Sequence, residues 1–121
     1  RSPAFFHTQY RQIPWLRELH PDPIVRIHPE TAADYGVKEG AWVYIESPRG
    51  RCKQKALVTF GMRRGIVLAD HGWWLPEKQD PEHGCWDANI NVLTDNEKGW
   101  DPGLGCTPGR SLLCKIYKVE E

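Results

Sequence analysis

The sequence lacks long hydrophobic stretches, internal repeats and low-complexity segments. Its longest apolar runs, at 41–45 and 66–69, are only four or five residues long. A membrane-spanning helix needs about 20 apolar residues, so the sequence contains neither such a helix nor the core of a signal peptide. The chain has 121 residues, of which 40% are hydrophobic and 26% are charged. This is the composition of one domain, residues 1–121, without direct membrane insertion.

The sequence also lacks net charge, because 16 basic residues balance 16 acidic ones. This balance argues against a dedicated nucleic-acid binder. The charges are nevertheless segregated: residues 49–64 carry six cations and no acid, whereas residues 70–101 carry eight acids and two lysines. The two stretches are either solvated faces that attract each other, or the basic stretch meets an anionic partner.

Several catalytic and metal-binding patterns are missing. None of the 4 cysteines belongs to a Cys-x-x-Cys pair, which argues against structural zinc, and the irregular spacing argues against a disulfide framework. The nearest ligand cluster, His71 with His83 and Cys85, is more simply explained as loop residues and a thiol, so we expect no metal site. Without a Gly-Ser pair or a Gly-x-Ser-x-Gly motif, self-processing decarboxylase and hydrolase chemistry are excluded.

A methionine at the start is missing as well. The first residue is Arg1 and the single methionine is Met62. We therefore expect the chain to be part of a longer protein.

Proline, glycine and tryptophan are abundant, with 10, 11 and 6 residues. Their number predicts many turns and few long helices. We expect an irregular segment at 1–22, a helix at 28–36, a loop at 77–86, and strands at 24–27, 41–47, 51–60, 66–69 and 112–119. Short strands separated by Gly/Pro turns, with one small helix, indicate a closed, mainly-β barrel.

The order of several motifs resembles one family. Residues 27–43, IHPETAADYGVKEGAWV, resemble the signature of the molybdopterin dinucleotide-binding domain. This is the C-terminal domain of the large subunit in molybdenum and tungsten enzymes of the dimethyl-sulfoxide-reductase family. Further stretches are similar to that domain in the same order: 47–50, 58–59, 64–67, 71–74, 89–94 and 101–116. The resemblance covers nearly the whole chain.

The resemblance implies a mainly-β fold, a double-psi β-barrel with one or two short helices. Family members usually begin with a hydrophobic strand and a Thr-Gly-Arg turn, and here Arg1 is all that remains of that turn. We therefore expect a barrel that either lacks its first strand or replaces it, with a sheet edge that invites pairing with another chain.

The resemblance also implies the site. The family domain holds pterin and nucleotide parts of the cofactor, which requires hydrogen-bond donors rather than acid–base pairs. We expect cofactor contacts from His7, Thr8, Asn89, Asn91, Arg110 and Trp73, with Gln9, Arg11 and His71 as weaker candidates. Asn91 matches the family's Asn-x-Leu-Thr element, and we expect Asn89 and Asn91 to alternate on an extended stretch. Either Trp73 or Trp74 is expected in the core, and the other in the wall of the cleft.

The implied function is a cofactor-binding module of a molybdopterin oxidoreductase. The cofactor is molybdopterin guanine dinucleotide with molybdenum or tungsten in the full-length enzyme, and the isolated domain is expected to hold none and to be catalytically silent. Expected partners are the remaining domains and an iron–sulfur electron-transfer subunit. The alternative is a stand-alone recognition barrel that binds an anionic partner through the basic hairpin 49–64.

Overall fold

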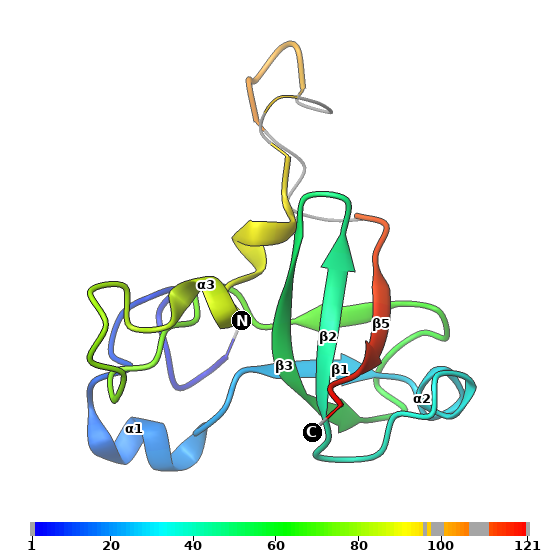
Figure 1. Cartoon of the computed structure of the whole chain (residues 1–121), viewed down its shortest axis with the longest axis horizontal. Helices are drawn as coiled ribbons and strands as arrows, with labels where there is room; N and C mark the ends of the chain where they lie inside the picture. Colours follow the sequence, from blue (N-terminus) through cyan, green and yellow to red (C-terminus); the bar gives the residue numbers. More distant parts are fainter. Residues whose placement is uncertain (1, 96, 98–100, 107–111, 121) are drawn as a thin grey trace.

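A five-stranded sheet forms the centre of the molecule, which we describe from a computed structural model covering residues 2–95, 97, 101–106 and 112–120. The strands lie in the order β4-β1-β3-β2-β5 (Figure 1). Their bounds are β1 Ile24–Ile27, β2 Trp42–Ser47, β3 Gly50–Val58, β4 Val67–Ala69 and β5 Lys115–Lys118. β1 runs parallel to β3, whereas the other neighbouring strands are antiparallel. The mainly-β prediction is confirmed, and so are the predicted strand at 24–27 and the hairpin that follows.

Strict alternation along the central strands explains the core. Inward-facing Val43 and Ile45 of β2 and Cys52 and Ala56 of β3 are buried, whereas their neighbours in sequence face outward. The pleat of a strand places successive side chains on opposite faces of the sheet. These residues pack with Val25, Ile27, Ala32, Val37, Leu93 and Ile116 in one hydrophobic cluster.

The helices are short. Their bounds are α1 Pro14–Leu19, α2 Pro29–Asp34, α3 Cys85–Ala88 and the 3₁₀ helix η1 Ile90–Leu93. The predicted helix at 28–36 is confirmed as α2. Pro29 suits its first turn, and the His28 side chain caps it by accepting a hydrogen bond from the Glu30 N–H. Gly36 then adopts a left-handed conformation that ends the helix.

The expectations for the segments 14–19 and 66–69 are wrong. Residues 14–19 form α1 instead of irregular chain; this helix starts at a proline but buries none of its residues, so it has no apolar periodicity to read from the sequence. The stretch 66–69 is not a buried strand, since Leu68 is 51% exposed. β4 lies at the edge of the sheet, and among the described residues it pairs with β1 alone.

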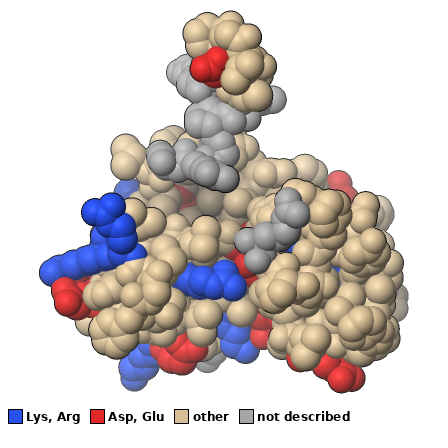
Figure 2. Space-filling model, turned by 180° about the vertical axis from the view of Figure 1, so that it is seen from behind, with Lys and Arg blue, Asp and Glu red and all other residues tan. Residues whose placement is uncertain are grey.

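The two oppositely charged stretches meet at one residue of the described part. Arg49 lies 3.7 Å from Asp95 and 4.0 Å from Glu97, whereas Lys55 and Arg64 pair with acids outside the acidic stretch. On the face seen in Figure 2, most of the surface is uncharged, and basic and acidic side chains lie together in small groups. Within the described residues, no helix is long and apolar enough to cross a membrane.

Candidate functional site

Two loops that are far apart in sequence meet at His7 and His71. Their rings are hydrogen-bonded, with 3.0 Å between His7 Nδ1 and His71 Nε2. Gly72 follows with a φ of +63°, and a methyl group there would lie 3.1 Å from Thr8 Cγ2 and 3.2 Å from the His7 carbonyl carbon. A residue with a side chain would therefore push the two loops apart.

Arg11 holds both loops from the inside. Its Nε donates to the Gly72 carbonyl (3.0 Å), and its Nη2 donates to the carbonyls of His7 (3.0 Å) and His71 (3.1 Å). The guanidinium carbon also lies 4.5 Å from the ring centroid of Phe5 and 4.0 Å from that of Trp73. Arg11 is only 2% exposed, and burial lowers its pKa to about 10 although the charge of Asp70 opposes that shift. The side chain remains charged at neutral pH and fixes the shape of the loop pair.

The two tryptophans have different places. Trp73 has no exposed surface and packs edge-on against Phe5, with ring centroids 5.6 Å apart. Trp74 is partly exposed, and its indole Nε1 donates to the Thr8 carbonyl at 2.6 Å. Of the pair, Trp73 thus lies in the core, and Trp74 is the one that lies beside the exposed Thr8.

Gln54 connects this loop pair to the segment that carries the two asparagines. It is fully buried, and its Nε2 donates to the carbonyls of Asp70 (2.8 Å) and Ala88 (3.0 Å). Its Oε1 accepts from the Asp70 N–H at 3.0 Å. Asp70 directly precedes His71 and Ala88 directly precedes Asn89, so one side chain holds both segments. Sequence reasoning missed Gln54; the available signal was a polar residue at an inward position of the β3 alternation.

The sequence suggested that Asn89 and Asn91 alternate on an extended stretch, and this expectation is wrong. Asn89 Oδ1 accepts from the Asn91 N–H at 3.0 Å and thereby caps η1. Ser47 Oγ, at the end of β2, holds the other end of η1 through the Leu93 carbonyl (2.9 Å). Asn91 is exposed, and its side-chain amide makes no hydrogen bond to any described residue. Its amide is available to a ligand, whereas that of Asn89 is partly used.

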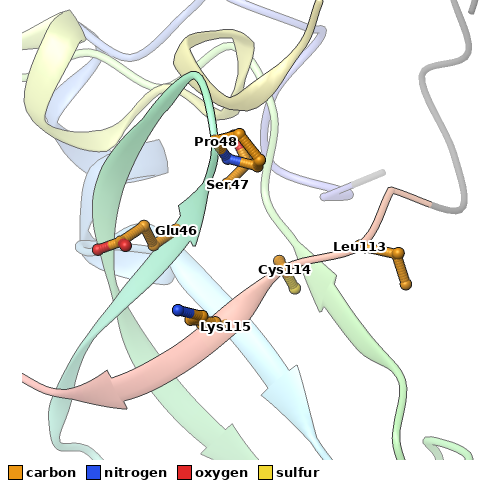
Figure 3. A pocket seen from close by; sticks show the side chains of 6 residues that line it. All are labelled: Glu46, Ser47, Pro48, Leu113, Cys114 and Lys115. Carbon is orange, nitrogen blue, oxygen red and sulfur yellow. The ribbon is translucent and has the colours of Figure 1, made fainter.

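The remaining expected site residue, Arg110, lies outside the described residues. A cavity of about 310 Å³ opens between the β2–β3 turn and the start of β5 (Figure 3). Its lining contains none of the predicted site residues. Among the described residues, no three His, Cys, Asp or Glu side chains are arranged to hold a metal ion.

Next to the loops lies a partly buried series of polar contacts in the order Ser–His–Asp. Ser2 Oγ lies 3.0 Å from His20 Nδ1, and His20 Nε2 lies 2.8 Å from Asp70 Oδ2. The adjoining cavity measures only about 10 Å³, which holds about one water molecule and no substrate. The arrangement is therefore a structural support for the loops rather than a hydrolytic triad.

The chain matches a known family over most of its length. The model of the molydopterin dinucleotide binding domain family matches residues 1–109. Dopamine dehydroxylase of Eggerthella lenta is 41% identical over 119 residues, which cover 98% of this chain and 12% of that protein. The molybdopterin-containing subunit of thiosulfate reductase from Salmonella typhimurium is 46% identical over 66 residues, which cover 54% of this chain and 8% of that protein.

A solved structure agrees with these matches. Acetylene hydratase from Pelobacter acetylenicus superposes with a TM-score of 0.93 and 29% identity over 98% of this chain and 17% of that chain. This chain thus spans less than a fifth of the length of these relatives. The resemblance found in the sequence and the prediction of a molybdopterin dinucleotide cofactor are confirmed. The chain belongs to the family of molydopterin dinucleotide binding domains.

Proposed function

We propose that this chain holds the pterin and nucleotide parts of a molybdopterin guanine dinucleotide in a larger oxidoreductase. The observation that carries this proposal is the Gln54 bridge. It joins the His71–Gly72 loop, which Arg11 ties to the His7–Thr8 loop, to the asparagine segment 89–91. Exposed donors from three separate segments thus lie on one rigid frame, which suits a ligand with several polar groups.

The residues present fit such a cofactor. The open amide of Asn91 both donates and accepts, which matches the edge of a pterin or guanine ring. Thr8 offers a hydroxyl, His7 an imidazole, and Trp74 forms an aromatic side of the same loop pair. Arg110 precedes the last strand and is proposed to contact a phosphate, because a guanidinium binds phosphate through two parallel hydrogen bonds.

The cofactor would supply the redox chemistry, and the side chains of this chain would bind and orient the cofactor. When bound, the cofactor supplies a metal that takes up and releases electrons. The described side chains bind and orient: Arg11 fixes the loop carbonyls, and Asn89 fixes the turn that presents Asn91. In this proposal the chain is not catalytic by itself, and the remaining domains of the enzyme complete the site.

Two further features belong to the same proposal. We place the sheet in a double-psi barrel that lacks its first strand; the parallel pairing of β1 with β3, although β2 lies between them in sequence, supports such crossed connections. We also propose that the enzyme is partnered by an iron–sulfur electron-transfer subunit. The thiosulfate reductase relative is named as the molybdopterin-containing subunit of its enzyme, which supports an assembly of more than one chain.

The test compares Asn91→Ala with Asn89→Ala in the full-length enzyme, as pterin released per protein after extended dialysis. We expect Asn91→Ala to release more, because an unpaired cofactor edge in a partly desolvated cleft costs about 1–3 kcal/mol, or roughly 5- to 150-fold in affinity. Asn89→Ser serves as a second control, since serine preserves the cap of η1. Equal retention in the two alanine variants, or a larger loss in Asn89→Ala with folding intact, would overturn the assignment of Asn91.

A further inference from the structure

One face of the sheet lies outside both the core and the candidate site. In Figure 1 the strands β2, β3 and β5 lie in front, and no helix is drawn over them. Besides Glu46, and Lys55, which pairs with Asp22, their outward-facing side chains include three aromatic rings and three cations. We call this set the aromatic–basic face; it consists of Trp42, Tyr44, Arg51, Lys53, Lys115 and Tyr117.

The aromatic rings hold the cations in place. The Arg51 guanidinium carbon lies 4.3 Å from the ring centroid of Tyr44, and its Nη1 lies 3.4 Å from the Tyr117 hydroxyl. The rings of Tyr44 and Tyr117 are 5.5 Å apart, and Lys53 Nζ lies 6.0 Å from the ring centroid of Trp42. A guanidinium has five N–H donors, so most of those on Arg51 stay open while its position is fixed.

The charge of this face is only partly compensated within the described residues, because a single acid, Glu46, stands opposite both Arg51 and Lys115. Arg51, Lys53 and Lys115 have no carboxylate within ion-pair distance there, whereas Arg49, Lys55 and Arg64 of the same basic stretch do. The one acid among the outward residues of these three strands, Glu46, accepts a hydrogen bond from the Tyr117 hydroxyl. The surface therefore presents three positioned cations against one carboxylate.

The face ends at the cavity of about 310 Å³, which Glu46 and Lys115 also line. Pro48 and the 92% exposed Leu113 add apolar surface there (Figure 3). Aromatic and arginine side chains around apolar contact area are the composition that dominates protein–protein interfaces.

We propose that the aromatic–basic face docks an acidic segment of a second protein chain. Carboxylates of that segment pair with Arg51, Lys53 and Lys115, and an apolar side chain enters the cavity beside Leu113. Three cations are few for binding a phosphate backbone, and the sequence as a whole has no net charge. These two observations favour a protein over a nucleic acid as the partner. This inference does not depend on which residues hold the cofactor.

The test uses the full-length enzyme and a short fluorescein-labelled poly-glutamate peptide with one central leucine, measured by fluorescence anisotropy. We expect binding that weakens with salt, and a loss of about 5-fold for Arg51→Glu or Lys53→Glu. Arg63→Glu is the matched control: it reverses an exposed charge of the same basic stretch, without a described carboxylate partner, between β3 and β4. It should change affinity by no more than about twofold.

Three results would overturn the proposal. These are no binding of the peptide, an equal loss in Arg63→Glu, or equally tight binding of a thymidine oligonucleotide or of phosphatidylserine vesicles. Cofactor content and the melting temperature are measured for every variant. A loss of cofactor in Arg51→Glu or Lys53→Glu would assign the face to the cofactor instead, whereas failure of the Asn91 assignment leaves this proposal intact.

Discussion

At the scale of single residues, the buried carboxylate of Asp70 contacts three residues of the segment 20–26. It lies 2.8 Å from His20 Nε2, accepts from the Ile24 N–H at 3.1 Å, and pairs with Arg26 at 3.3 Å. Burial alone raises the pKa of Asp70, but the hydrogen bonds from His20 and Ile24, with the charges of His20 and Arg26, outweigh it. The pKa therefore lies below its ordinary value of 3.8.

Because this pKa is lowered, the fold is expected to lose stability in acid. The unfolded chain binds a proton at Asp70 more readily, so the carboxylate stabilises the fold above pH 3.8 and loses this contribution as pH falls through the folded-state pKa. We expect Asp70→Asn to lower the free energy of unfolding by about 3 kcal/mol at neutral pH, because it leaves His20 and Arg26 without their anion. Urea unfolding at neutral and acid pH measures both effects.

The control is Glu18→Gln, which removes an exposed carboxylate on α1. It should change the free energy of unfolding by no more than about 0.5 kcal/mol. If the Asp70→Asn protein loses stability in acid as steeply as the parent, the acid dependence does not come from Asp70.

The sequence does not reveal Asp70's role, because its Ile24 and Arg26 partners lie 46 and 44 residues away. The same holds for Arg11, whose acceptors at Gly72 and His71 are 61 and 60 residues away. By contrast, His7, Thr8 and Asn91 were identified as candidate ligands from short, local sequence motifs. Local motifs thus supplied the candidate ligands, and the residues that hold them in place depend on long-range contacts.

At the scale of elements, Gly72 sets how closely the two candidate loops approach. Its φ of +63° disfavours any side chain, and a methyl group would contact both Thr8 and the His7 backbone. Gly36 has nearly the same φ, +64°, but nothing lies within 4 Å of a methyl group there. The two glycines therefore separate the cost of the backbone conformation from the cost of the close approach.

We expect Gly36→Ala to cost about 1 kcal/mol in the free energy of unfolding, from the left-handed conformation alone. Gly72→Ala should cost more, and in the full-length enzyme it alone should also lower cofactor retention, because it displaces His7 and Thr8. Denaturant unfolding and pterin content are the two measurements. Equal effects of the two substitutions on both measurements would show that the close approach does not matter.

Elements with local causes were predictable and the others were not. The β2–β3 hairpin follows from aromatic and β-branched residues on either side of a Pro-Arg-Gly turn, and α2 from its proline start and glycine end. η1 has no such signal: its ends are held by Asn89 and by Ser47, a residue of a distant strand. The sequence therefore indicated an extended stretch at Asn89 and Asn91, although Ile90–Leu93 fold into a turn of 3₁₀ helix.

At the scale of the whole molecule, two hydrophobic clusters meet at Gln54. One lies on the inner side of the sheet, and the smaller one consists of Phe5, Trp73 and Ala88 with Ala4, Leu16 and Leu75. Gln54 projects from β3 and bonds the backbone at Asp70 and Ala88, between the two clusters. Gln54 thus connects the sheet to the segments around Asp70 and Ala88 through buried hydrogen bonds.

We expect Gln54→Leu to destabilise the protein by about 2–4 kcal/mol, because an apolar side chain leaves the buried carbonyls of Asp70 and Ala88 without the donor that they share. Cofactor retention in the full-length enzyme should fall as well, since the His71 and Asn89 segments lose their common anchor. Cys52→Ala, at the previous inward position of β3, should cost about 1 kcal/mol of packing and leave retention unchanged.

Denaturant unfolding and pterin content again measure the two effects. Unchanged cofactor retention in a folded Gln54→Leu protein would mean that the two segments are positioned independently of each other.

The position of β5 at the edge of the sheet also bears on how the chain folds during synthesis. β5 pairs with β2, and the contact between Tyr117 and Glu46 closes a separation of 71 residues. The β2–β3 hairpin is local and can form as soon as it leaves the ribosome, whereas distant pairings are slow because of the entropy of closing the intervening chain. Until residues 115–118 emerge, one side of β2 is an unprotected template, and the nascent domain is most exposed to mispairing in that interval.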